Sequence, residues 1–223
     1  MDDMQKITEQ LGDVGRQILC ASRNELYMKM RFLDVALCSF SYIMDDNIET
    51  MGTDGFAIYF NPRFLGGIYR EERILVNRIY LHMVLHGIFR HMTGRKGRDS
   101  RYYDLACDIV AEYIIDGMRH RCILRRRSVL RREAYRRLEA KMKVLTAEKV
   151  YSALTEREMG GQELMRLEEE FRIDSHSRWP DEDDRKQQQQ IQNKWQDISE
   201  QMETDMETFS KAASAESGRL IDQ

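Results

Sequence analysis

Two histidines four residues apart are the side chains whose type and spacing first suggest chemistry. His82 and His86 lie in LHMVLHGIFRH, residues 81–91. Residues four apart on a helix project from one face at neighbouring heights, so both imidazoles can direct a nitrogen atom to one ion. The pair is therefore a candidate for two ligands of a divalent metal. Two core histidines can instead hydrogen-bond to the backbone or to a carboxylate, and that alternative stays open.

A pair of acidic residues could supply the third ligand from a neighbouring helix. Asp108 and Glu112 are also four apart and share one face of a second predicted helix. Asp108 stands between apolar neighbours such as Leu105 and Ile109, where an unpaired charge would be costly. Asp108 therefore needs a partner, which a metal ion or a core histidine could provide.

A third histidine, His91, is less well placed for the same ion. It follows His82 by nine residues, which amounts to about 900° of rotation and puts it on the opposite side of a continuous helix. We therefore treat His91 as an alternative ligand that could contribute only if the helix broke, for example at Gly87.

The position after His82 decides what a metal site could catalyse. The zinc-peptidase signature is H-E-x-x-H, in which the glutamate accepts a proton, but here that position is Met83. General acid–base assistance is typically worth about 10²- to 10⁴-fold, so a site with Met83 should be a poor peptidase. Glu112 could replace the base from the other helix, or it could pair with an arginine or a histidine. Met83 itself could simply pack as an apolar filler.

The surrounding pattern predicts helices and a little β-structure. Apolar positions recur at helical spacing over residues 70–92 and again over 102–118, which predicts two long helices that carry the candidate ligands. A turn at 53–55 precedes an aromatic and β-branched strand over 56–60, which Asn61-Pro62 ends. The expected fold class is mainly α (α+β), with one small β-hairpin.

Composition supports a soluble, helix-rich protein. The 223 residues are 33% charged and 42% apolar and include two prolines, which argues against a β-sandwich or barrel. No apolar run approaches the roughly 20 residues that cross a bilayer, and no secretory signal is visible, so we expect a cytoplasmic protein without membrane contact. We assign residues 1–180 to one domain and 181–223 to a polar, acidic extension that is helical or disordered.

The charge is unevenly distributed along the chain. Residues 119–143 are rich in arginine and could attract phosphates, which makes a nucleic-acid-binding or protein-binding regulatory module a rival hypothesis. Apolar residues interrupt the arginines, and no DNA- or RNA-binding motif is recognisable. A salt-bridged helix surface is therefore the preferred interpretation, and we do not expect nucleic acid as a partner.

Five segments together carry a family resemblance that spans about residues 16–180. The chain resembles the zincin-like family of bacterial putative metallopeptidase domains found N-terminal to von Willebrand A-like domains. The matching segments are TDGFAIYFNPRFL (53–65), HMVLHGIFRH (82–91), DLACDIVAEYI (104–114), LTAEKVY (145–151) and DSHSRWP (174–180). His176 and Trp179 belong to the last of these, but the sequence suggests no chemistry for them.

The resemblance implies a zinc ion with His82, His86 and Asp108 as its ligands. The family glutamate does not carry over to Met83, so a degenerate protein with weak or no peptide hydrolysis is expected. An active peptidase that uses Glu112 as base is the alternative. The family also implies a MoxR-type ATPase as partner and an extension that leads toward a von Willebrand A-like domain. In zincins an edge strand pairs with substrate, so an extended peptide along strand 56–60 is a further expectation.

Overall fold

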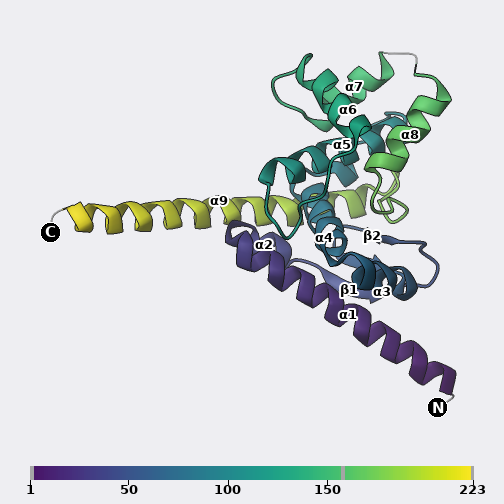
Figure 1. Cartoon of the computed structure of the whole chain (residues 1–223), viewed down its shortest axis with the longest axis horizontal. Coiled ribbons are helices and arrows are strands. Elements are labelled where there is room, and N and C mark those ends of the chain that lie inside the picture. Colours follow the sequence, from purple (N-terminus) through teal and green to yellow (C-terminus); the bar gives the residue numbers. More distant parts are fainter. Residues whose placement is uncertain (1–2, 157–158, 222–223) are drawn as a thin grey trace.

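The chain folds into helices packed around a small sheet, which confirms the expected fold class. The computed structural model describes residues 3–156 and 159–221, with side chains described from 5 to 208 outside the same gap. Within these residues, nine α-helices accompany one three-stranded sheet (Figure 1). Among the described helices, none combines the length and the apolar character that crossing a membrane requires.

Two central helices carry the first candidate residues. Helix α4 (Arg73–Ile88) is buried continuously from Val76 to Gly87, and α5 (Ser100–Met118) packs beside it. The prediction of one helix over 70–92 is wrong at both ends. A preceding helix, α3 (Pro62–Glu71), is separated from α4 by the extended backbone of Glu72, with φ −148°.

The end of α4 also differs from the prediction, and this relocates His91. The helix stops at Ile88, and Arg90 adopts a left-handed φ of 55°, a rare conformation for a residue with a side chain. A short 3₁₀ helix, η2 (His91–Thr93), follows. The chain therefore turns back at Arg90 instead of continuing the helix past His91.

The remaining helices form two groups around this pair. On the sheet side, α1 (Asp3–Lys29) leads through η1 (Arg31–Leu33) into α2 (Asp34–Leu37). On the α5 side, α6 (Val129–Glu139), α7 (Ala147–Thr155) and α8 (Gly161–Phe171) enclose a second apolar cluster that includes Tyr135 and Phe171 (Figure 1). The Thr146 hydroxyl accepts from the Lys149 amide at the start of α7, as expected for an N-cap.

The sheet has one strand more than the expected hairpin. Strands β2 (Met51–Thr53) and β3 (Ala57–Phe60) are antiparallel, and β1 (Ser41–Met44) pairs with β3 in parallel. Because the order is β1-β3-β2, β3 is the middle strand and both of its edges are occupied. The expectation that a peptide pairs along residues 56–60 therefore fails for that strand.

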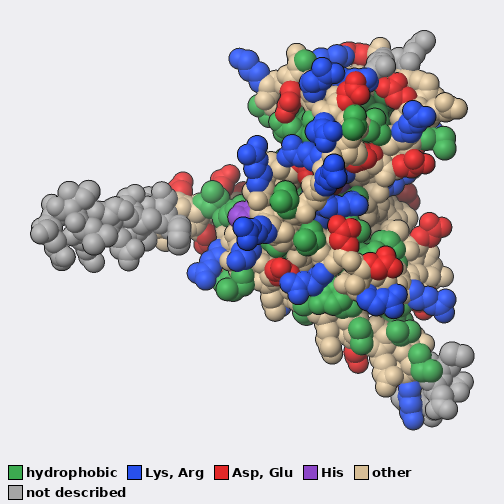
Figure 2. Space-filling model, viewed as in Figure 1, with side chains coloured by type: hydrophobic (Ala, Val, Ile, Leu, Met, Phe, Trp, Pro, Cys, Tyr) green, Lys and Arg blue, Asp and Glu red, His purple; other side chains and the backbone are tan. Residues whose placement is uncertain are grey.

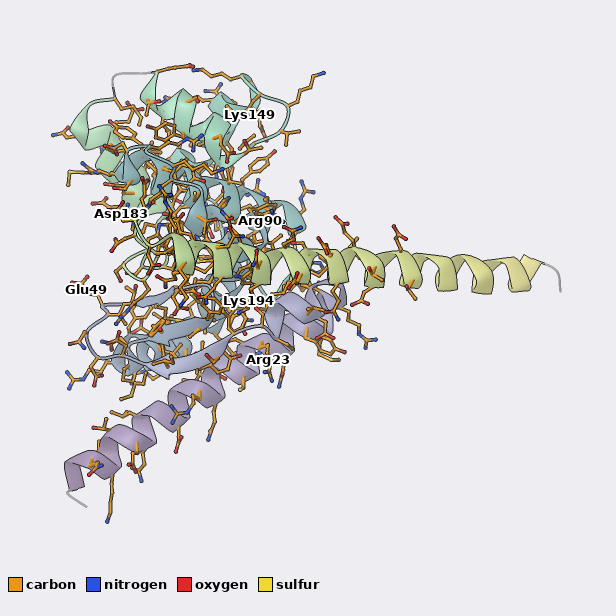
Figure 3. All side chains as sticks on the ribbon, turned by 180° about the vertical axis from the view of Figure 1, so that it is seen from behind. Arg23, Glu49, Arg90, Lys149, Asp183 and Lys194 are labelled. Atoms are coloured by element: carbon orange, nitrogen blue, oxygen red, sulfur yellow. The ribbon has the colours of Figure 1, made fainter. Side chains whose placement is uncertain are left out.

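The polar C-terminal segment is a helix, α9 (Arg185–Ile221), and its first part belongs to the core. Ile191 and Trp195 are fully buried and Ile198 nearly so. Their spacing of four and three residues is helical, but the polar residues around them made this apolar stripe hard to recognise in the sequence. The main apolar core therefore includes residues beyond 180, where we expected the domain to end. Figures 1 and 3 show α9 crossing the body of the molecule and then projecting away from it.

Gly87 explains how α9 lies so close to α4. A Cβ atom at Gly87 would stand 2.2 Å from the Trp195 ring, so any side chain there would displace the tryptophan. The Trp195 indole donates to the Gly55 carbonyl oxygen at 3.1 Å. Lys194, labelled in Figure 3, donates to the Ser39 and Gly55 carbonyl oxygens at 2.9 Å each. These contacts fix α9 across both α4 and the sheet.

Candidate metal centre

Five donor side chains, four of them from buried residues and one from the partly buried His176, converge between α4, α5 and the segment that follows α8. They are His82 and His86 from α4, Asp108 from α5, and Asp174 and His176 from the irregular segment after Phe171. One ligand atom from each lies within 4.8 Å of all the others. The structure thus brings together the three ligands that the family resemblance implied, and it adds two more donors.

The donor atoms face one another at close range. Asp108 Oδ1 lies 3.2 Å from His82 Nε2, 3.3 Å from His86 Nε2 and 3.0 Å from His176 Nε2. Asp174 Oδ1 lies 3.5, 3.9 and 3.3 Å from the same three nitrogen atoms. Three imidazole nitrogens and two carboxylates therefore surround one point.

Several of these groups lack the hydrogen bonds that buried polar atoms require. Both oxygens of Asp174 and Nε2 of His86 have no hydrogen-bond partner among the described residues, although they are fully buried. Most buried polar groups in proteins are satisfied, and an unpaired buried charge is costly. A cation held by imidazole and carboxylate would satisfy all three atoms, and such a mixed set suits divalent transition metals.

The other nitrogen of each histidine is engaged outside the cluster. His82 Nδ1 lies 3.2 Å from Glu112 Oε1, and His86 Nδ1 lies 2.9 Å from Nδ1 of His91. His176 Nδ1 contacts Asp104 Oδ2 at 3.4 Å. Histidines that bind metals almost always use their second nitrogen in this way, because the contact orients the ring. All three Nε2 atoms are thereby left facing the centre.

Glu112 belongs to a buried ionic network and not to the centre of the cluster. Its Oε2 accepts from Arg78 Nε at 2.9 Å and from Arg78 Nη2 at 2.6 Å, and it also contacts Arg131. Burial alone would raise its pKa, but the hydrogen bond with His82 and the two arginines lower the pKa of Glu112 to about 2. Glu112 therefore pairs with arginines and a histidine, which was the alternative to a role as base. It contacts His82 at Nδ1, the nitrogen that faces away from the centre.

His91 and Met83 are close to the cluster but are not among its five donors. His91 contacts His86 from behind because the chain turns at Arg90, and burial holds its pKa well below the ordinary value. It is therefore a neutral partner of His86 and lies outside the five-residue cluster. Met83 is fully buried in the main apolar core and presents no proton acceptor.

The pKa shifts of the three imidazoles show that the two carboxylates favour positive charge in the cluster. Burial alone would lower the pKa of His82, but hydrogen bonds to Asp108 and Glu112 raise it to about 9. Asp108 and Asp174 likewise outweigh burial at His176 and hold its pKa well above the ordinary value. Burial lowers the pKa of His86 to about 4. Without a metal, His82 and His176 are therefore both positively charged at pH 7 while His86 is neutral, which gives the imidazoles the same total charge as a divalent ion.

Asp174 and His176 are the functional candidates that sequence reasoning missed. They stand two apart in DSHSRWP, and residues two apart in an extended segment point to the same side. This two-residue spacing was the feature of the sequence that could have indicated a shared role for Asp174 and His176. Their partners lie on other elements, so the segment alone does not reveal what the two side chains approach.

A cavity of about 610 Å³ lies beside the cluster and is lined by its two loop donors. Asp174 and His176 form part of its wall, whereas His82, His86 and Asp108 do not. Glu49, labelled in Figure 3, lies at the same cavity, in the connection between β1 and β2. A molecule in the cavity would therefore meet the loop donors before the helix donors.

The arginine-rich segment contributes to the fold through ion pairs. Arg131 is buried and pairs with Glu112 and Glu170, and Arg137 pairs with Glu133 and Glu163. Figure 2 shows acidic side chains interspersed with the basic ones over the upper helices. This arrangement is the salt-bridged surface that the sequence pattern favoured.

The comparison with known families agrees with the geometry. No curated protein and no solved structure matches the chain. The family described as "Putative metallopeptidase domain" matches residues 16–220, a range that includes nearly all of α9 as well as the five donors. With the match covering most of its length and a buried His/Asp cluster at its centre, the chain belongs to this metallopeptidase-domain family.

Proposed function

We propose that this protein is a metallopeptidase-like protein that binds one divalent ion, zinc, and hydrolyses peptides weakly or not at all. The observation that carries the proposal is Asp174, a fully buried carboxylate with no hydrogen-bond partner in the described structure, facing three imidazole nitrogens. A buried carboxylate in that state requires a positive charge nearby. The family membership favours a metal ion as its source.

Zinc is supported by the nature of the donors. Zn²⁺ commonly takes imidazole nitrogen together with carboxylate oxygen, and its coordination can expand from four to five ligands. His82, His86 and Asp108 would hold the ion from the helices, and Asp174 and His176 would hold it from the loop. A zinc ion there would supply Lewis acidity toward a carbonyl oxygen.

Weak hydrolysis is supported by the loss of the glutamate at the usual base position and by the pairing of Glu112. Met83 occupies the position of the usual glutamate, and Glu112 is neutralised by Arg78 and Arg131. Asp174 is a carboxylate at the centre, where its charge is needed to hold the ion. The loss of general acid–base assistance costs about 10²- to 10⁴-fold in rate.

Elemental analysis of the purified protein tests the metal directly. The protein is stripped with a chelator, reloaded separately with Zn²⁺ and other divalent ions, desalted and measured by mass spectrometry. We expect about one zinc ion per chain in the wild type and in His120→Ala, a histidine outside the cluster, and none in His82→Ala. A wild-type protein that keeps no stoichiometric metal after reloading would refute the proposed function.

A peptide assay tests the second half of the proposal. Zinc-loaded protein is incubated with a mixed library of fluorogenic peptides, with and without chelator. We expect no chelator-sensitive turnover above the level of His82→Ala. Robust turnover would contradict the weak-hydrolysis part alone and would favour the active peptidase. The Glu112→Gln variant would then show whether that residue is its base.

A further inference from the structure

The segment that carries the two loop donors is docked on the outer edge of β2. Gly52 of β2 forms a parallel bridge with Ser175, and the Ser175 amide donates to the Met51 carbonyl oxygen at 2.6 Å. Ser175 is the residue between Asp174 and His176. The outer edge of β2 therefore holds the backbone whose flanking side chains enter the cluster.

Gly52 lies where this docking leaves no room for a side chain. A Cβ atom at Gly52 would stand 2.3 Å from the carbonyl oxygen of Ser175 and 3.2 Å from its carbonyl carbon. Both are backbone atoms, so the obstruction could be relieved only by moving the segment or the strand. The φ angle of Gly52 lies outside the left-handed range, so alanine would cause no backbone strain of its own.

We propose that Gly52 is a positioning residue of the metal centre, which acts by allowing residues 174–176 to dock on β2. The proposal rests on the proposed metal-binding function. The helix donors need no such device, because the spacing along α4 and the packing of α4 against α5 place them. The loop donors have no helix to hold them, and the close approach at Gly52 takes that role. The sheet thus positions two of the five donors without contributing a ligand.

Alanine at Gly52 tests this directly. We expect Gly52→Ala to push the segment away from β2 and to weaken Zn²⁺ and Co²⁺ binding by about 10- to 100-fold, the range typical of outer partners of metal ligands. Affinity is measured by competition with a chromophoric chelator. The matched control is Gly66→Ala in α3, where a Cβ atom would meet nothing within 4 Å.

Two further measurements separate positioning from a general loss of structure. The visible spectrum of bound Co²⁺ depends on the number of its ligands, so Gly52→Ala should resemble the double variant Asp174→Asn/His176→Gln. Adding Gly52→Ala to that double variant should cause no further loss of affinity, because the donors it acts through are already gone. Ser175→Pro removes the amide that donates to Met51 and leaves β2 intact, so it should reproduce the loss if Gly52→Ala fails to fold.

The outcomes are distinct. Weaker binding in Gly52→Ala or Ser175→Pro, with no additional loss in the double variant, supports the proposal. Wild-type affinity in the folded variants overturns it, as does an equal loss in the double-variant background. If the wild type itself binds no Co²⁺ or Zn²⁺, the proposed function fails first and this inference fails with it.

Discussion

Helix α5 carries a stripe of buried acids whose two halves have opposite surroundings. Asp104, Asp108, Glu112 and Asp116 recur every four residues, and all four are buried. In the C-terminal half, Glu112 and Asp116 each contact the guanidinium groups of both Arg78 and Arg131. In the N-terminal half, Asp104 is paired with Arg95, but Asp108 faces three histidines and another carboxylate.

The difference shows that burial of acids does not by itself mark a metal site. Asp116 accepts from Arg78 at 2.7 Å and from the Tyr135 hydroxyl at 3.0 Å, so its charge is fully compensated. Among the described residues, the nearest guanidinium to Asp108 is that of Arg172, 4.0 Å from its Oδ2. The Glu112 half is a balanced structural cluster. The Asp108 half requires positive charge, which protons or a metal ion must supply.

Substitutions in the balanced Glu112 half should reduce the stability of the fold. Arg78→Met leaves Glu112 and Asp116 short of a fully buried partner, and breaking such a pair typically costs about 3–5 kcal/mol. We expect a loss of that size in the free energy of unfolding, measured by urea denaturation in the presence of chelator. A loss that appears only when metal is present would contradict the division between the two halves.

Substitutions in the unbalanced Asp108 half should instead reduce the affinity for metal. Sharing a zinc-binding free energy of about 10–16 kcal/mol among four or five donors gives roughly 2–4 kcal/mol for each donor. Asp108→Asn should therefore weaken zinc binding by about 30- to 10³-fold, measured by chelator competition. Glu112→Gln, one turn away on the same helix, should weaken it by about 10- to 100-fold, since Glu112 orients His82 from outside. An effect of Glu112→Gln larger than that of Asp108→Asn would reverse the assignment.

Metal binding to the Asp108 half should release protons, whereas the Glu112 half binds none to release. In the metal-free protein the raised pKa values of His82, about 9, and of His176 keep both imidazoles protonated at pH 7. Metal binding at Nε2 must displace about two protons, so the affinity should rise as the pH rises, by about 100-fold per unit between pH 7 and about 8.5. Once the pH exceeds the raised pKa of His82, the rise should fall to about 10-fold per unit, and it should level off only when His176 has also lost its proton. An affinity that is independent of pH over this range would mean that the cluster does not bind the metal through these nitrogens.

An exposed ion pair supplies the smallest expected effect. Arg101 pairs with Glu168 at 2.7 Å, but its side chain is half exposed. Solvent screening leaves such pairs with little net contribution to stability. Arg101→Met should therefore leave the free energy of unfolding nearly unchanged in the same urea experiment. A change as large as that of Arg78→Met would show that burial is not what separates the two arginines.

Local spacing was enough to predict the helix half of the site. His82 and His86 share a face because a helix repeats every 3.6 residues, and the same reasoning placed Asp108 and Glu112 together on α5. The mainly helical fold followed from composition and periodicity. These features depend on neighbours in sequence, so no knowledge of packing was needed.

Packing decided what local spacing could not. The approach of Asp174 and His176 depends on the contact between Gly52 and Ser175, more than one hundred residues apart in the chain. The role of Glu112 depends on Arg78 and Arg131, which arrive from two other helices. The burial of Trp195 depends on the missing side chain of Gly87.

The sequence alone thus determined which helix residues could ligate a metal and which helix faces carry them, but it did not reveal the loop donors Asp174 and His176. Only the tertiary structure decided which carboxylate meets the imidazoles and which meets the arginines. The physical reason is that Asp108 and Glu112 have the same charge, the same burial and the same helix face. What distinguishes them is the set of distant side chains that compensates each charge, and only folding brings those side chains together.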